Sequence, residues 1–494
     1  MAAEVKKAAE TVGFCYNFRP PLFQSPMRRQ MSRPRPCGAE RIRLKRMGLA
    51  ALAGRPFRAQ ERFGSARVFV DASSKAQTAK AANMGWPPGF AVMAALRPHG
   101  SFSVSFSVSF SFFSSPLRMQ TNIQTALAAG HQIWVDHLSR DFLRSGQFRS
   151  WLDKGVTGLT SNPSIFLKAI GRKDDYDELK SLNPGEKAAV ALIDAMSADV
   201  REAARQMTAL HAQSNGDQGY ASIELNPRFA NDERLALGEA LYIRRRMGEQ
   251  KNFMIKIASN ETGARCCEML GRLGFNVNMT LIFSVERAQQ LLEAWQRAMV
   301  WRKANGLDPT AQRMVLSFFV SRIDVALEPK LPRDLKWKVA VAYARKAYGE
   351  WDYFFQNKTW QGTLADVPRP KLLWASTGAK RPEQSPTLYV DALISANTVD
   401  TLPEKTLQAF LEKGDPAPKF SGCDDDCRLI LFRAGEANAH PDSCAQKLFD
   451  DGLAQFARAY DGYFEALHGD DSRNEEEYET LRRLYGQTVD QARS

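Results

Sequence analysis

Four polar side chains lie in segments of the chain that are otherwise apolar. Lys256 lies in FMIKI and Asp136 ends IWVD, whereas Glu224 and Thr280 lie in YASIEL and NVNMTLIF. A lysine amine that is desolvated or close to a cation loses its proton more readily, attacks a ketone and forms an imine. The C–C bond next to the imine can then break if a carboxylate takes the proton of the hydroxyl across that bond. We therefore predict that Lys256 forms the imine and that Asp136 is the acid/base. Glu224 and Thr280 are candidates for positioning the water of imine formation and hydrolysis.

Each of these side chains also has a structural explanation. A lysine in an apolar strand can lie at a sheet edge with its amine in water, and Asp136 or Glu224 could cap a helix or join a salt bridge. Asn278 and Thr280 could simply hydrogen-bond inside a barrel. However, five successive apolar segments each carry a polar side chain at the corresponding place. Burying a lysine or a carboxylate costs several kcal/mol unless it is paired, so this recurrence favours a catalytic site.

These residues lie on short apolar segments that alternate with longer amphipathic ones. The short segments span residues 133–136, 156–162, 220–225, 253–257, 276–283, 314–322, 371–377 and 397–401. Helix-like stretches lie between them, such as 284–304, where Ser284 is the predicted N-cap, and 334–355. Eight strands that alternate with helices predict a (β/α)8 TIM barrel. A doubly wound open sheet would have a Gly-rich phosphate loop after the first strand, and DHLSR (136–140) is not one.

Alternation with period two places the polar residues of each strand on one face. The residues that share a face are Trp134 with Asp136, Thr160 with Asn162, Ser222 with Glu224, Met254 with Lys256, and Asn276 with Asn278 and Thr280. In a closed barrel this face points inward, and polar residues near the C-terminal ends of barrel strands are typical of catalytic sites. Arg322, which follows SFFVS, carries a guanidinium suited to holding a phosphate.

The net charge of +12 belongs to an N-terminal extension. Residues 1–118 hold 19 Lys and Arg against 5 Asp and Glu, whereas the rest of the chain holds 48 against 50. The body therefore has no excess charge that would attract nucleic acid. The extension is rich in Pro and Arg, and its alternating tract SFSVSFSVSFSF (101–112) is of low complexity. We expect residues 1–118 to be disordered, and residues 119–494 to form the barrel with closing C-terminal helices.

The extension fits an organellar transit peptide, because it is rich in Arg and Ser and poor in acids. The alternatives are untranslated sequence before a start at Met119 and a basic tail that binds nucleic acid. We expect a plastid location if the extension is a transit peptide and a cytoplasmic one otherwise. No segment approaches the roughly 18 uncharged apolar residues of a membrane-spanning helix.

Eight longer segments occur in an order typical of one enzyme family, through most of residues 121–410. They are WVDHLSR (134–140), GVTGLTSNPSIF (155–166), GYASIELNPRFA (219–230), NFMIKIASNETG (252–263), GFNVNMTLIFSVERAQ (274–289), SFFVSRID (317–324), LLWASTGAK (372–380) and LYVDALISANTVDTLPEKTLQAF (388–410). The combination of TSNP with the lysine strand and NxTLIFS is highly specific. In these segments the body resembles the transaldolases, in the longer form found in bacteria and plants. The resemblance implies a (β/α)8 barrel of the class I aldolase type.

The resemblance also implies a site and a reaction. Lys256 would be the imine lysine, Asp136 the acid/base, and Glu224 would hold the catalytic water. The other residues that the resemblance places at the site are Asn162, Asn278, Thr280, Ser317, Phe319, Arg322, Ser376 and Lys380. Of these, Arg322, Ser376 and Lys380 would bind substrate phosphate. The family moves a dihydroxyacetone unit from sedoheptulose 7-phosphate to glyceraldehyde 3-phosphate, which gives erythrose 4-phosphate and fructose 6-phosphate, and we expect no cofactor.

Two other functions stay open: a class I lyase that cleaves fructose 6-phosphate directly, and a non-enzymatic barrel that binds sugar phosphates. Phe319 favours the transferase, because the resemblance places phenylalanine here in transferases, whereas a hydroxyl side chain that could orient water suits a lyase. An inactive barrel is disfavoured because Asp136, Glu224 and Lys256 are all present. We expect sugar phosphates as partners and neither nucleic acid nor a membrane. The sequence leaves open whether the chain forms a homodimer.

Some features depart from the family's usual sequence. Asn226 stands where a more acidic residue is usual, and Ala-Ser-Asn (258–260) where Pro-Ala-Thr is common in the longer form. The region after about residue 412 resembles the family only loosely, although GLAQFARAYDGYFEAL (452–467) is typical of its closing helix. Four residues in this region could be drawn as a zinc site, namely Cys423, Cys427, His440 and Cys444. Because three aspartates fill the interval between Cys423 and Cys427, we expect a solvated loop and no metal. We expect all seven cysteines to be reduced, as is usual in a cytosolic or stromal setting.

Overall fold

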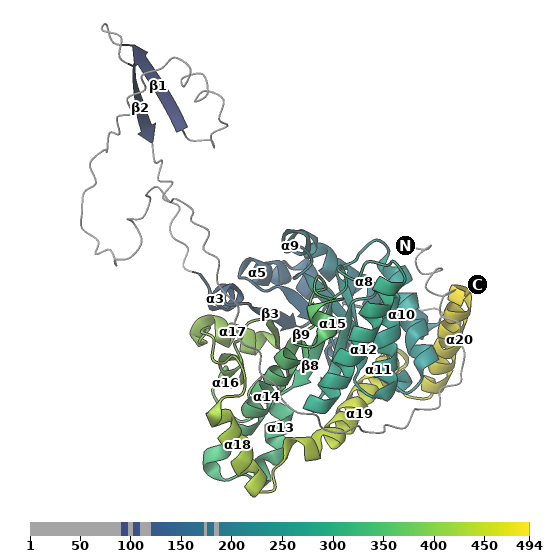
Figure 1. The fold of residues 1–494 in the computed structure, drawn as a ribbon. Coiled ribbons are helices and arrows are strands. Elements are labelled where there is room, and N and C mark those ends of the chain that lie inside the picture. Colours follow the sequence, from purple (N-terminus) through teal and green to yellow (C-terminus); the bar gives the residue numbers. More distant parts are fainter. Residues whose placement is uncertain (1–89, 97–101, 109–119, 172–174, 182–186, 494) are drawn as a thin grey trace. The chain divides into compact units, whose positions relative to one another are not determined.

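The structure is a computed structural model that describes residues 90–96, 102–108, 120–171, 175–181 and 187–493. Eight strands form a closed barrel in the order β10-β3-β4-β5-β6-β7-β8-β9, and all neighbouring pairs are parallel. Figure 1 labels three of them, β3, β8 and β9. The strands are β3 (His131–Asp136), β4 (Gly158–Thr160), β5 (Tyr220–Glu224), β6 (Phe253–Ala258), β7 (Val277–Ile282), β8 (Met314–Phe319), β9 (Lys371–Ala375) and β10 (Thr398–Leu402). Each predicted strand corresponds to one of them, so the predicted TIM barrel is confirmed.

Helices follow the strands and cover the outside of the barrel. They are α3 (Asn122–Ala128), α4 (Arg140–Arg144), α5 (Gln147–Asp153), α6 (Pro163–Ile170), α7 (Asp177–Lys180), α8 (Ala188–Gln206), α9 (Thr208–Gln213), α10 (Glu233–Met247), α11 (Glu261–Arg272), α12 (Val285–Ala304), α13 (Ser321–Leu327), α14 (Val339–Phe354), α15 (Lys358–Gln361), α16 (Leu388–Ala392) and α17 (Glu404–Lys413), with 3₁₀ turns η1 (Pro227–Phe229), η2 (Glu328–Lys330) and η3 (Arg333–Leu335). All residues of β5 to β8 are buried, because helices cover the outside of these strands and side chains fill the inside. None of the helices in the described ranges is both long and apolar enough to cross a membrane.

The two helices singled out from the sequence have different outcomes. The side chain of Ser284 accepts a hydrogen bond from the backbone N–H of Arg287 and caps α12, as predicted. The helix expected from residue 334 begins only at Val339. The turn η3 and the positive φ of 63° at Trp337 interrupt it, because a left-handed residue cannot continue a right-handed helix.

Three helices complete the described chain: α18 (Asp425–Glu436), α19 (Pro441–His468) and α20 (Asn474–Arg493). The segment expected to form the closing helix lies within α19, which packs against α6, α13 and β7. α20 lies beside α10 (Figure 1), where a side chain at Gly238 would meet the backbone oxygen of Tyr485 at 2.4 Å. The C-terminal helices are therefore part of the packed body rather than an appendage.

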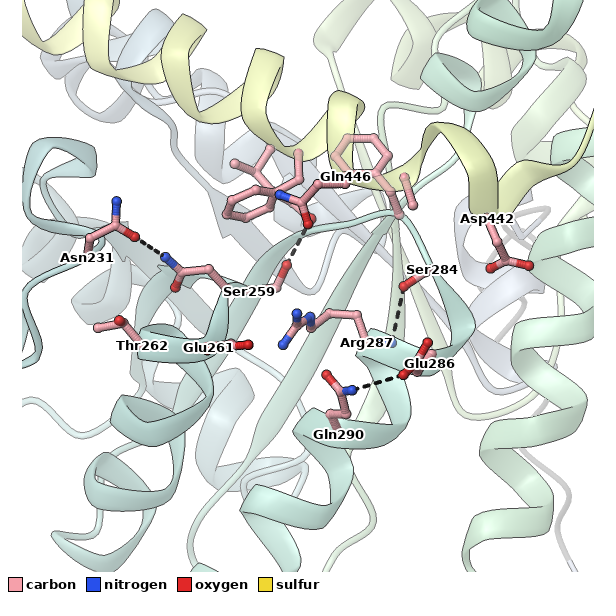
Figure 2. Close-up of a pocket in the computed structure, with 15 residues that line it drawn as sticks. Asn231, Ser259, Glu261, Thr262, Ser284, Glu286, Arg287, Gln290, Asp442 and Gln446 are labelled. Carbon is pink, nitrogen blue, oxygen red and sulfur yellow. Dashed lines mark hydrogen bonds between the residues drawn. The ribbon is translucent and has the colours of Figure 1, made fainter.

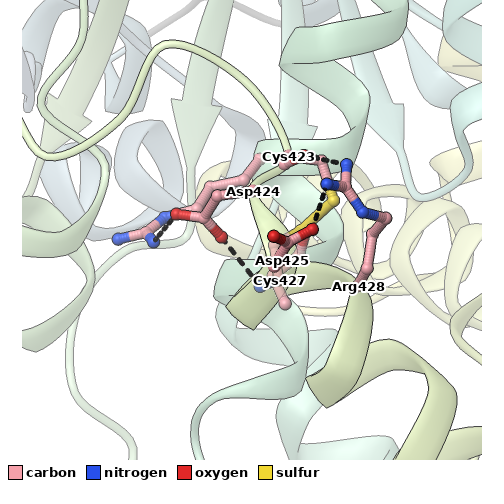
Figure 3. Close-up of a disulfide and its surroundings, with 7 residues drawn as sticks. Cys423, Asp424, Asp425, Cys427 and Arg428 are labelled. Atoms are coloured by element: carbon pink, nitrogen blue, oxygen red, sulfur yellow. Dashed lines mark hydrogen bonds and ion pairs between the residues drawn. A yellow bond between two sulfur atoms is a disulfide. The ribbon is translucent and has the colours of Figure 1, made fainter.

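Cys423 and Cys427 form a disulfide at the N-terminus of α18 (Figure 3), so the expectation that all cysteines are reduced is wrong for this pair. Cys423 lies before the N-cap Asp424, whose side chain accepts a hydrogen bond from the N–H of Cys427 at 2.8 Å. The helical turn places the two cysteines close together, which the local sequence Cys-Asp-Asp-Asp-Cys did not indicate. Of the other cysteines, Cys266 and Cys267 are both buried and Cys444 is half-buried.

The N-terminal extension contains a described pair of strands, β1 (Phe90–Leu96) and β2 (Phe102–Val108). They pair in antiparallel fashion, with Phe90 opposite Val108 and Leu96 opposite Phe102. Part of the alternating Ser/Phe/Val tract is therefore a strand, which the interpretation of residues 1–118 as disordered did not include. The rest of that interpretation lies outside the described residues.

Candidate active site

The amine of Lys256 lies inside the barrel. Lys256 is on β6, where it is opposite Glu224 of β5 and Asn278 of β7, and its side chain is only 6% exposed. Its Nζ lies 3.0 Å from Glu224 Oε2 and donates a hydrogen bond of 3.0 Å to the backbone oxygen of Ser161. The lysine is therefore not at an edge with its amine in water. Burial raises the pKa of Glu224, and the charge of Lys256 opposes this rise.

Asp136 ends β3 and is fixed by side chains from the neighbouring strand and helix. Its Oδ1 accepts a hydrogen bond of 2.8 Å from Thr160, and its Oδ2 lies 3.5 Å from the amide nitrogen of Asn162. The other end of the Asn162 amide caps α6 through the N–H of Ile165, which turns the nitrogen toward Asp136. Burial raises the pKa of Asp136 above its ordinary value, and the charge of Lys256 and the Thr160 hydrogen bond oppose the rise. A carboxyl group of raised pKa is suited to exchanging a proton near neutral pH.

A row of polar side chains crosses the barrel interior behind the lysine. Ser317 donates to Asn278 Oδ1 at 2.7 Å, and Asn278 donates to Ser222 at 3.1 Å. The side-chain amide of Asn278 therefore has hydrogen-bond partners inside the barrel, as its structural explanation requires. The hydroxyl of Thr280 is buried without a hydrogen-bond partner in the described residues and is available to a water or a substrate.

Two cations predicted to bind phosphate lie on the side of β8 and β9. Arg322 is half-buried, lies over the ring of Phe319 at 5.4 Å and donates to Gln455 Oε1 at 3.0 Å. Burial lowers the pKa of Lys380, and the charge of Arg322 lowers it further. Ser376 has a positive φ of 56°, and its hydroxyl lies 3.0 Å from that of Ser321. No carboxylate of the described residues pairs with Arg322 or Lys380, so the two positive charges are free to meet an anion.

One cavity of about 630 Å³ brings most of these residues together. The predicted site residues that line it are Asp136, Asn162, Lys256, Thr280, Ser317, Phe319, Arg322, Ser376 and Lys380. Glu224 and Asn278 do not line it and lie beside Lys256 in the barrel wall. The sequence analysis missed His137, Lys168, Thr401, Glu404, Gln455 and Phe456, which also line the cavity. Thr401 lies on β10, and the alternation of inward and outward side chains along this strand could have indicated it. Gln455 and Phe456 lie on α19, where no local sequence pattern indicates that they reach the cavity.

A second cavity, of about 550 Å³, lies outside this group of residues (Figure 2). It is lined by the N-terminal ends of α11 and α12, including Glu261 and Arg287, and by Asp442 and Gln446 of α19. None of the predicted site residues lines it. It touches Phe283, whose ring lies 5.2 Å from that of Phe319 in the first cavity.

The four residues that could be drawn as a zinc site, Cys423, Cys427, His440 and Cys444, do not form a metal site in the described part of the chain. Cys423 and Cys427 are bonded to each other, and no group of three or more His, Cys, Asp or Glu side chains there could hold a metal ion.

Comparisons with known proteins agree with this architecture. A family model described as Transaldolase/Fructose-6-phosphate aldolase matches residues 133–467. A protein named Transaldolase from Neisseria gonorrhoeae is 36% identical over 344 residues, which cover 69% of this chain and 98% of the relative. A Transaldolase from Thiobacillus denitrificans is 35% identical over 345 residues, covering 67% and 95%. Transaldolase 2 from a Nostoc species is 33% identical over 365 residues, covering 69% and 95%.

Proposed function

The chain belongs to the transaldolase/fructose-6-phosphate aldolase family, and we propose that it is a transaldolase that moves a dihydroxyacetone unit from sedoheptulose 7-phosphate to glyceraldehyde 3-phosphate through an imine on Lys256. The observation that carries the proposal is the buried amine of Lys256, which lies 3.0 Å from Glu224 and shares a cavity with Asp136. A buried amine beside two carboxyl groups of raised pKa has the proton donors and acceptors that imine chemistry needs. The products are erythrose 4-phosphate and fructose 6-phosphate, as in the pentose phosphate pathway.

In the proposed reaction the amine of Lys256 attacks the ketone carbon of the donor and gives a carbinolamine. Loss of water from the carbinolamine gives the imine, and Glu224 holds the water that leaves and later returns. Asp136 takes the proton of the hydroxyl on the far carbon of the breaking C–C bond, while the electrons of that bond move to the imine nitrogen. The aldehyde product leaves, and a three-carbon enamine stays on Lys256. The enamine attacks the acceptor aldehyde, Asp136 returns the proton, and hydrolysis releases the new ketose.

The phosphate of each substrate is proposed to bind Arg322, Ser376 and Lys380. A guanidinium and an ammonium group without carboxylate partners in the described residues favour a phosphate dianion, which compensates both charges. The hydrogen bond from Arg322 to Gln455 and the packing on Phe319 orient the guanidinium before substrate arrives. A preorganised cation loses less side-chain entropy when it binds.

Transfer rather than hydrolysis is supported by the apolar wall of the cavity. Phe319 lines the cavity and packs against Phe283, with ring centroids 5.2 Å apart. The apolar side chain of Phe319 has no group that could orient a water against the enamine. The three-carbon unit therefore stays bound to Lys256 until an acceptor aldehyde reacts with it.

The test is a coupled assay with sedoheptulose 7-phosphate and glyceraldehyde 3-phosphate, with fructose 6-phosphate formation as the readout. We expect rapid formation of fructose 6-phosphate and little free dihydroxyacetone. If fructose 6-phosphate alone releases dihydroxyacetone as fast as transfer proceeds, the protein is a lyase and the proposal is wrong.

A further inference from the structure

The turn that follows Glu224 is held by a buried carboxyl group from another helix. We define the Glu224 turn as residues 225–230. The backbone N–H of Leu225 donates to the backbone oxygen of Lys256 at 2.9 Å, and the N–H of Asn226 donates to Glu239 Oε2 at 2.9 Å. Glu239 lies on α10 and is fully buried. Two residues after Glu224, the chain is therefore hydrogen-bonded to Glu239, a carboxyl group that does not line the cavity.

The same turn is also fixed from the C-terminal helices. Arg228 Nε donates to Asp461 Oδ1 of α19 at 3.0 Å, and Tyr478 of α20 donates to the same oxygen at 2.5 Å. The ring of Phe229 lies 6.0 Å from that of Tyr485 and 6.1 Å from that of Tyr478. The Glu224 turn is therefore held by contacts with three helices, α10, α19 and α20.

A buried carboxyl group such as that of Glu239 destabilises the fold more than an apolar side chain would, so packing alone does not explain it. No cation of the described residues pairs with Glu239, and besides the N–H of Asn226 its carboxyl group has the hydroxyl of Tyr485 as a hydrogen-bond partner. Tyr460 is the other nearby titratable group, and its hydroxyl is buried without a hydrogen-bond partner in the described residues. Burying a carboxyl group costs free energy unless hydrogen bonds compensate for the lost contact with water. The hydrogen bond from the N–H of Asn226 is the contact that links this carboxyl group directly to the Glu224 turn.

We propose that Glu239 is a positioning residue of the active site, which holds the Glu224 turn through Asn226 and so fixes the carboxylate of Glu224 against Lys256. This inference rests on the proposed function, in which Glu224 holds the water of imine formation and hydrolysis. Glu239 does not touch the substrate and acts only through the backbone of the turn. Because the phosphate groups bind on the opposite side of the barrel, a loss of this bond changes the rate of the water steps and leaves substrate affinity unchanged.

Two pairs of variants test the bond from its two ends. Glu239→Leu removes the acceptor, and Glu239→Gln keeps an oxygen in the same place. Asn226→Pro removes the N–H donor at a residue whose φ of −57° suits proline, and its matched control Asn226→Ala keeps the N–H. Both changes at residue 226 remove the side-chain cap on the N–H of Arg228, so the pair differs chiefly in the donor.

We expect kcat of Glu239→Leu and Asn226→Pro to fall about 10- to 100-fold, with KM for both sugar phosphates unchanged. Glu239→Gln and Asn226→Ala should stay close to wild type. The double variant Glu239→Leu with Asn226→Pro should be no slower than either single variant, because each single variant already removes the same hydrogen bond, from Asn226 to Glu239. If Glu239→Leu does not fold, the pair at residue 226 carries the test.

The inference is overturned if Asn226→Pro and Asn226→Ala have equal kcat, or if Glu239→Leu has the kcat of wild type. It is also overturned if the loss is entirely in KM. These outcomes differ from a failure of the proposed function, in which the wild-type protein itself transfers no three-carbon unit.

Discussion

Glu224 Oε2 and Lys256 Nζ lie 3.0 Å apart on neighbouring strands, and both side chains are almost fully buried. The pairing follows from the register of β5 and β6, in which the two residues are direct partners. Removing one member of such a pair leaves the other buried without its counter-charge, which is strongly destabilising. Variants at this pair must therefore be checked for folding before their activity is interpreted.

Lys256→Arg should abolish transfer, because a guanidinium stays protonated and cannot attack a carbonyl. In the wild-type protein, borohydride with fructose 6-phosphate should inactivate the enzyme and add a reduced sugar-derived unit to the peptide that contains Lys256. Mass spectrometry of the digested protein locates the modified residue. A modification on another lysine would contradict the assignment.

Asp136→Asn should lower kcat by about 10²–10⁴-fold, because the amide cannot take the proton of the substrate hydroxyl. Imine formation should survive, since Lys256 and Glu224 are unchanged. Borohydride labelling of Lys256 in this variant, measured beside kcat, separates the two steps. Loss of labelling together with loss of turnover would show that Asp136 is needed earlier, for imine formation.

Arg322→Gln should raise KM for sedoheptulose 7-phosphate by about 10- to 100-fold, since hydrogen bonds to a charged group contribute about 1.5–3 kcal/mol. The effect on fructose as donor should be small, because fructose has no phosphate. Arg205→Gln, which changes an exposed arginine paired with Glu202, is the control. Equal effects of Arg322→Gln on both donors would contradict the phosphate assignment.

Glu239 should make stability depend on pH. Burial raises its pKa in the folded protein to about 8, from 4.5, so the folded state keeps a proton that the unfolded state has lost. The free energy of unfolding that this group contributes therefore falls as pH rises from about 4.5 to about 8, by at most about 1.4 kcal/mol per pH unit. Glu239→Gln has no such proton, so its Tm relative to wild type should rise over this range. Parallel Tm curves for the two proteins would contradict the raised pKa.

A chain that begins at Met119 should fold and transfer the three-carbon unit at the wild-type rate. The reason is that the residues lining the cavity all lie between Asp136 and Phe456. The measurement is kcat and KM in the coupled assay, with circular dichroism as the folding control. A folded but slower protein would show that residues 1–118 contribute to the site.

The barrel and much of the site follow from local patterns in the sequence. Short apolar runs with polar residues at every second position identify the eight strands. The alternation of side chains along a strand is enough to predict that Lys256 and Thr280 face the interior. The helix that begins at Val339 was predicted too early, because the left-handed residue Trp337 before it has no signature in its neighbours. The disulfide and the bond from Asn226 to Glu239 depend on how turns and helices meet in space. Neither contact gives a periodic pattern in the sequence, although Cys423 and Cys427 are only four residues apart.

Helix α19 contacts the site at two places that are six residues apart. Gln455 accepts a hydrogen bond from Arg322, which we propose binds phosphate, and Asp461 accepts one from Arg228 of the Glu224 turn. A helix advances about 1.5 Å and turns about 100° per residue, so inserting or deleting one residue between them would break one contact or the other. Between residues 455 and 461, α19 should therefore tolerate substitutions on its outer face but no insertion or deletion. Relatives that keep both contacts should differ in length only before residue 455 or after residue 461.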